Sequence, residues 1–187
     1  MSGAAAFGQL VLSTAFVLSI VAKLRDFPAF RAHVSATLPA LGRLAPWTAA
    51  CCVASEAGIT VALFAVRPPW VGPALACILI TAFTGYLLHL VTSGGGASCG
   101  CAGADDIPAS WVHVLRNAAL FTTAAVLVLL TVPGGGGTVA AHPAALAVYA
   151  VVAAPAAAAG ALLLHLPDVI ALFRPPTDTR QPSKGPL

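Results

Sequence analysis

The chain has 187 residues, of which 59% are hydrophobic and only 8% are charged, and its formal net charge is +3. Soluble domains carry roughly 25% charged residues, so this composition excludes a water-soluble globular protein and predicts a protein of the lipid bilayer. The small and scattered excess of basic residues also excludes a nucleic-acid-binding surface, which needs basic side chains clustered on one face.

Five segments are apolar over the length that a helix needs to cross a bilayer, about 20 residues. They are residues 4–22, 46–66, 70–92, 111–132 and 143–165, separated by charged residues, proline or glycine. The first segment lacks the basic start of a signal peptide, and its apolar run is too long for one, so we expect a retained helix. The pattern predicts an all-α integral membrane protein.

The segments between the spans have recognisable patterns. In residues 23–44, apolar side chains recur at intervals of three and four, which predicts a short helix at the membrane interface. Residues 67–70 read Arg-Pro-Pro-Trp and predict a tight turn, because proline cannot continue a helix. Asp106 or Ser110 is expected to cap the fourth span, and Pro155 to kink the fifth.

Successive spans run in opposite directions, so one membrane face receives the end of span one, the start of span two, the end of span three and the start of span four. The chemically active residues expected at this face are Lys23, Cys51, Cys52, Cys99, Cys101, His113 and Arg116, with Glu56 deeper in the membrane.

A charged group in hydrocarbon costs at least about 2.5–3.5 kcal/mol and usually has a partner. We expect Glu56 to pair with Arg116, with Asn117 beside Arg116 and Lys23 as a further member. These charges either lock the helix register or tune and relay protons at a redox site.

Cys99 and Cys101 are separated only by Gly100. A turn through glycine brings two Cα atoms within the roughly 4.4–6.8 Å that a disulfide requires. Such a small ring is strained, and strained, exposed disulfides tend to be catalytic or regulatory. The start of span four, with Arg116 below it, favours the thiolate form. We therefore predict thiol-disulfide exchange, in which one thiolate attacks a partner disulfide and the second cysteine resolves the mixed disulfide.

Other roles for the cysteines stay open. The pair either fills a loop or binds a metal with Asp105, Asp106 and His113. Because zinc sites usually space their cysteines two to four apart and add a second pair, we predict no metal site. Cys52 is a candidate relay thiol, although buried cysteines commonly act as small apolar residues.

The chain resembles the MauE family of methylamine-utilisation membrane proteins, within the wider DoxX-like group of membrane helix bundles. The features that carry the resemblance are Ser19 to Lys23, Phe27 to Phe30, Glu56, Cys99-Gly100-Cys101-Ala102-Gly103 and Arg116-Asn117-Ala118-Ala119-Leu120. Ala102 departs from the aromatic residue that the family often has there.

The resemblance covers about residues 5–132 and implies a four-helix DoxX-like domain over residues 1–132. We expect a glycine-rich linker and a fifth transmembrane helix over residues 133–166, and a disordered polar tail over residues 167–187. The resemblance also implies a bacterial protein that supports disulfide formation in the small subunit of methylamine dehydrogenase, alongside a thioredoxin-like partner.

The basic residues predict the orientation in the membrane. Four lie after span one (Lys23, Arg25, Arg31, Arg43) and three in the tail, against Arg67 alone on the other face. By the positive-inside rule, the Cys-Gly-Cys loop is cytoplasmic. Oxidation of a secreted substrate would require the opposite face. Either the pair exchanges electrons with a cytosolic thiol carrier, or the basic residues of the interfacial helix distort the count; we adopt the cytoplasmic placement.

Together these observations predict a multi-pass cell-membrane protein that performs thiol-disulfide redox chemistry. The expected partners are a thioredoxin-like redox protein or a maturing enzyme subunit, and the lipid bilayer. No cofactor is required, and a quinone is compatible as the final electron acceptor. The alternative is a non-enzymatic assembly factor for a partner protein. A small transporter has thin support, because a single buried acidic group makes no polar path.

Overall fold

The structure, a computed structural model, describes residues 3–92, 110–132, 143–166 and 169–170. These residues form helices and turns, and no strand occurs among them. The elements in chain order are α1 (Gly3–Arg25), α2 (Phe27–Thr37), the 3-10 helix η1 (Pro39–Leu44), α3 (Ala45–Ala65), α4 (Val71–Thr92), α5 (Trp111–Thr131) and α6 (Pro143–Leu164). Five helices are long and apolar enough to cross a membrane, which confirms the predicted all-α membrane protein.

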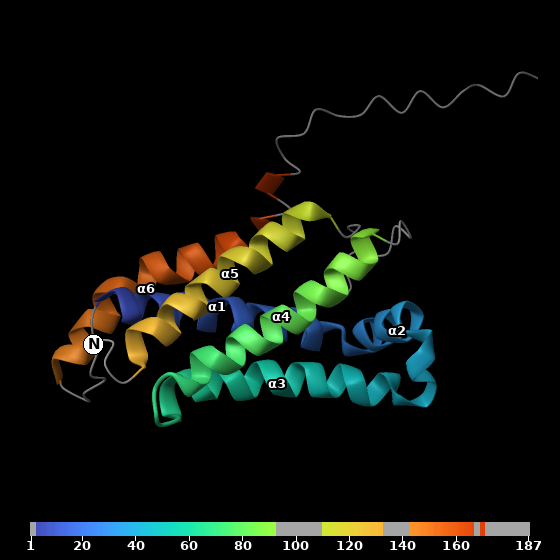
Figure 1. Cartoon of the computed structure of the whole chain (residues 1–187), viewed down its shortest axis with the longest axis horizontal. Helices are drawn as coiled ribbons and strands as arrows, with labels where there is room; N and C mark the ends of the chain where they lie inside the picture. The colour runs from blue at the N-terminus through green and yellow to red at the C-terminus, as the bar shows by residue number, and fades with distance from the viewer. Residues whose placement is uncertain (1–2, 93–109, 133–142, 167–168, 171–187) are drawn as a thin grey trace, which may run out of the picture.

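The helix α1 lies at the centre of the bundle (Figure 1). It packs against α3, α5 and α6, while α4 packs against α3 and α5. Within its most apolar stretch 56% of α1 is buried, compared with 17–28% for the four other candidate spans. Polar side chains on the inner face of α1 are therefore shielded from lipid.

The connection between the first two spans differs from the single interfacial helix predicted over residues 23–44. The helix α1 continues to Arg25, so Lys23 belongs to its last turn rather than to a loop. Asp26 then caps α2 by accepting a hydrogen bond from the Ala29 amide at 3.0 Å. This cap ends one helix and starts the next, because its side chain satisfies a free amide of the first turn.

Two predicted boundaries are confirmed. The Val71 amide donates to the Pro68 carbonyl at 3.1 Å, which closes the turn between α3 and α4. Ser110 is the N-cap of α5, and its amide donates to Nδ1 of His113 at 3.3 Å. Asp106, the other candidate cap, lies outside the described residues.

The fifth predicted span is the helix α6, which continues through Pro155. It packs closely along α1, since a Cβ added at Gly160 would lie 2.8 Å from the Val11 carbonyl oxygen and 2.9 Å from the Thr14 Cβ. The backbones of α1 and α6 thus approach at a point where only glycine fits, as is common between membrane helices.

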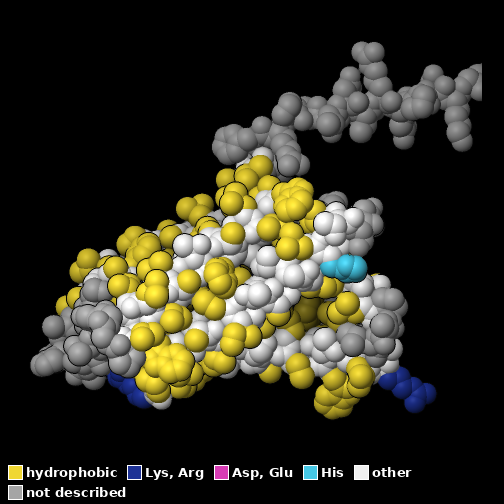
Figure 2. Space-filling model, in the orientation of Figure 1, with side chains coloured by type: hydrophobic (Ala, Val, Ile, Leu, Met, Phe, Trp, Pro, Cys, Tyr) yellow, Lys and Arg dark blue, Asp and Glu magenta, His cyan; other side chains and the backbone are white. Residues whose placement is uncertain are grey.

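Hydrophobic side chains are spread over the face of the bundle that Figure 2 shows. Large exposed hydrophobic side chains occur on every spanning helix, among them Val17, Val61, Ile78, Leu129 and Val151. In a soluble protein such a surface would cause aggregation, but in a bilayer it is the surface that faces lipid. The polar side chains of Lys23, Glu56, Arg116 and Asn117 are buried inside the bundle.

Candidate functional site

A buried ion pair joins α1 to α3. The Nζ atom of Lys23 lies 2.7 Å from Oε1 of Glu56, and each side chain is only 1% exposed. The sequence placed both residues at one membrane end but predicted Arg116 as the principal partner of Glu56. The structure corrects that pairing, because the last turn of α1 carries Lys23 inward against α3.

Ser19 completes this pair and was not predicted as a site residue. Its hydroxyl group donates to Oε1 of Glu56 at 3.2 Å, and Lys23 Nζ donates to the same hydroxyl oxygen. Ser19 precedes Lys23 by one helical turn, so the spacing of the two polar residues on α1 was the signal that could have identified it. The ammonium group also lies 5.7 Å from the ring centroid of Phe30 and 5.9 Å from that of Phe83.

Arg116 is buried at the start of α5 and has a different set of partners. Its Nε and Nη2 atoms donate to Oδ1 of Asn117 at 3.4 and 3.3 Å, and Nη1 donates to the Leu164 carbonyl at 3.5 Å. The side chain of Asn117 in turn donates to Thr84 Oγ1 at 3.4 Å. This second polar group therefore links α5 to α4 and α6.

The two polar groups share a small cavity of about 40 Å³. Ser19, Glu56, Arg116 and Asn117 line it, together with apolar side chains from α1, α4, α5 and α6. The structure thus brings together four of the predicted residues: Lys23, Glu56, Arg116 and Asn117. A carboxylate, two cations and an amide meet where the spanning helices converge.

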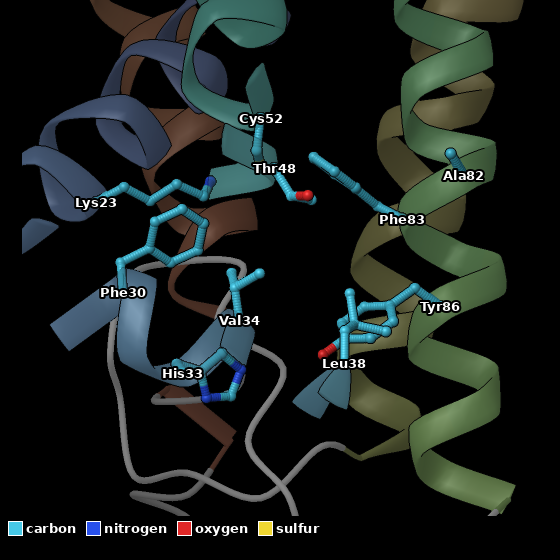
Figure 3. Close-up of a pocket in the computed structure, with 10 residues that line it drawn as sticks. All are labelled: Lys23, Phe30, His33, Val34, Leu38, Thr48, Cys52, Ala82, Phe83 and Tyr86. Atoms are coloured by element: carbon cyan, nitrogen blue, oxygen red, sulfur yellow. The ribbon is translucent and has the colours of Figure 1, made fainter. Parts of the chain in front are cut away.

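A larger pocket of about 220 Å³ lies on the other side of Lys23. Figure 3 shows Lys23, Phe30 and Cys52 on one side of this pocket, with Phe83 and Tyr86 of α4 opposite. The walls are largely apolar and aromatic, with His33 and Thr48 among the polar members. Burial lowers the pKa of His33 from its ordinary value of 6.5, because an imidazolium loses hydration there.

The described cysteines occupy different environments. Cys52, the predicted relay thiol, is half-buried and lines the larger pocket. Its neighbour Cys51 is exposed, and Cys77 is half-buried and packs against the apolar core. Cys51 and Cys77 are free thiols.

The predicted catalytic residues Cys99 and Cys101 lie outside the described residues, as do Asp105 and residues 171–187 of the predicted tail. In the sequence they fall between Thr92, where α4 ends, and Trp111, where α5 begins. His113, considered as a metal ligand with them, is buried and takes part in the cap of α5. Within the described residues no group of three or more His, Cys, Asp or Glu side chains could hold a metal ion.

The fold and these polar groups define a multi-pass α-helical membrane protein with a buried cluster of ionisable side chains. Residues 1–130 match the family described as methylamine utilisation protein MauE. The match spans more than half of the chain, so the protein belongs to the MauE family, as the resemblance indicated. No curated protein and no solved structure matches the chain.

Proposed function

We propose that this MauE-family protein is a membrane-embedded thiol-disulfide exchange protein that supports disulfide formation in a partner protein. The observation that carries the proposal is the pair Cys99 and Cys101, which lies within the residues 1–130 that match the family. Two thiols separated by one glycine are suited to a reactive, reversible disulfide.

In the proposed cycle, a thiolate of the Cys99 and Cys101 pair attacks the disulfide of a thioredoxin-like carrier. The mixed disulfide is resolved by the second cysteine, so the pair becomes a disulfide and the carrier becomes a dithiol. Two thiols of a maturing enzyme subunit then reduce the pair by the reverse exchange. Two electrons and two protons pass at each stage, from subunit to pair and from pair to carrier.

The buried charges support this proposal by their position. Lys23, Glu56 and Arg116 lie near the end of α1, within α3 and near the start of α5, and the loop that carries Cys99 and Cys101 leads into α5. Arg116 and the free amide groups at the start of α5 favour negative charge nearby and hence a thiolate. We assign Lys23, Glu56, Arg116 and Asn117 to charge-tuning and positioning, and Cys52 to a relay role.

For the orientation, we propose that the Cys-Gly-Cys loop faces the cytoplasm. The ion pair of Lys23 removes one charge from the count, because this residue is buried in the bundle. Arg25, Arg31 and Arg43 remain exposed at this end, against Arg67 at the other. Exposed basic residues therefore still outnumber those at the other end, which keeps the predicted cytoplasmic placement of the Cys-Gly-Cys loop.

The test is differential alkylation of native membranes followed by mass spectrometry. We expect Cys99 and Cys101 to be recovered as a reducible disulfide, with Cys77 in the same sample alkylated as a free thiol. Cys99→Ser and Cys101→Ser should each abolish disulfide formation in the maturing subunit, whereas Cys77→Ser should not. Two thiols that stay reduced under an oxidising challenge would overturn the proposal, and full maturation with the double serine variant would favour a non-enzymatic assembly factor.

Sidedness needs a separate measurement. A membrane-impermeant maleimide applied to intact cells should label Arg67→Cys in a background without other reactive cysteines. After reduction of the disulfide, the same reagent should reach Cys99 and Cys101 only when the membrane is opened. Labelling of Cys99 or Cys101 in intact cells would reverse the orientation.

A further inference from the structure

Glu56 lines the cavity between the two polar groups, and one of its carboxyl oxygens lacks a hydrogen-bond donor among the described residues. Oε1 of Glu56 accepts from both Lys23 and Ser19. Oε2 of the same carboxyl group is buried and has no hydrogen-bond partner among the described residues. A buried acceptor left without a donor costs about 1–3 kcal/mol, and more when it is charged. A group in this cavity that donates a hydrogen bond would remove that cost.

Arg116 lines the same cavity, and its hydrogen-bond donors lack strong acceptors. Its side chain is only 3% exposed and offers five N–H donors. Its hydrogen bonds within the described part of the chain go to two neutral oxygens, those of Asn117 and Leu164, at 3.3–3.5 Å. A buried guanidinium with long bonds to neutral acceptors is incompletely compensated. A group in the cavity that accepts a hydrogen bond from Arg116 would lower the free-energy cost of burying its guanidinium.

One small ligand satisfies both requirements. Water donates and accepts, whereas a halide only accepts and would be repelled by the Glu56 carboxylate on the same cavity wall. A cavity needs about 10–15 Å³ to hold a water molecule, together with two to four polar partners. This cavity has about 40 Å³ and four polar side chains in its lining.

We propose that this cavity is a hydration site, in which bound water bridges Oε2 of Glu56 to the guanidinium of Arg116. The bridge converts two separate polar groups into one network that runs from Lys23 through Glu56 and water to Arg116, Asn117 and Thr84. This inference goes beyond the proposed redox function and does not depend on Cys99 or Cys101.

The experiment is a crystal structure of the full chain in lipid, at a resolution that shows water, from crystals grown in chloride and in bromide. We expect density within about 2.6–3.2 Å of both Glu56 Oε2 and an Arg116 nitrogen, without an anomalous bromide signal. An empty cavity, a direct ion pair between Glu56 and Arg116, or a bromide peak would each overturn the proposal.

A second measurement gives opposite signs for a wet and a dry cavity. Ala15 lines the cavity, so Ala15→Val reduces its volume. If water is bound there, this variant loses the bridge, and its melting temperature in detergent should fall. In an Arg116→Leu background, where the bridge is already lost, the same substitution should be neutral or stabilising. A higher melting temperature of Ala15→Val in the parent chain would indicate an empty cavity and sink the idea.

Discussion

The ammonium group of Lys23 lies 2.7 Å from a carboxylate oxygen of Glu56 in the interior of a membrane bundle. The pair joins the last turn of α1 to the middle of α3 and is completed by the hydroxyl group of Ser19. Removing one member of a buried pair leaves an uncompensated charge, which in proteins costs about 3–5 kcal/mol. The pair therefore sets the register between α1 and α3.

For this pair we predict strong coupling. Lys23→Met and Glu56→Gln should each lower the free energy of unfolding by about 3–5 kcal/mol, since each leaves the other charge buried alone. The double variant should lose much less than the sum, because no lone charge remains. Unfolding in detergent measures all three, with the exposed Arg31→Gln as a control. If the double variant lost the sum of the two single losses, the charges of Lys23 and Glu56 would not stabilise each other.

Asn117 is expected to stabilise Arg116 through its side-chain oxygen. Asn117→Leu removes the acceptor that two guanidinium nitrogens share and should cost about 1–3 kcal/mol of unfolding free energy. Asn117→Asp keeps an oxygen there and adds a counter-charge, so it should retain more stability than the leucine variant. The measurement is thermal unfolding of both proteins in the same detergent. Equal losses in the two variants would mean that the oxygen contributes little.

The glycines offer a matched test of the contact between α1 and α6. Gly160→Ala places a Cβ against the backbone of Val11 and should lower the melting temperature. Gly58→Ala meets no atom within 4 Å and should be neutral or stabilising by up to about 1 kcal/mol, because alanine favours a helix. The measurement is the melting temperature of each variant in the same detergent. A neutral Gly160→Ala would argue against close packing of α6 on α1.

His33 should make stability depend on pH. Burial lowers its pKa in the folded protein, so the unfolded chain binds a proton more readily. The stabilising contribution of the neutral imidazole is present above pH 6.5 and is lost as pH falls below 6.5 toward the lowered pKa. Melting temperatures from about pH 8 to pH 5 should fall less for His33→Gln than for the parent chain. His89→Gln, at an exposed position on α4, is the control and should follow the parent.

Most of the fold could be predicted from the sequence. The hydrophobic runs placed five helices within a few residues of their observed ends, including the helix that contains Pro155. Span length and apolar composition are local properties, and the bilayer imposes a minimum length on them. The connection after span one was predicted less well, because Asp26 ends α1 later than the change in polarity suggests.

The site was predicted in part. The alternation of helix direction placed Lys23, Glu56 and Arg116 at one end of the bundle, and the structure brings them together. The role of Cys99 and Cys101 stays a prediction, drawn from their spacing and from the family. Ser19 was noted only as part of the family resemblance and not as a site residue, because its contact with Glu56 depends on how α1 packs against α3.

The sequence by itself determined that this protein spans the membrane, how many helices can do so and which family it belongs to. These properties follow from local hydrophobicity and from motifs read along the chain. Only the tertiary structure decided that Glu56 pairs with Lys23, that Arg116 donates to Asn117 and Leu164, and that a small cavity lies between these two polar groups. Such partners are distant in sequence, and their choice depends on how the helices rotate and pack, which no single segment encodes.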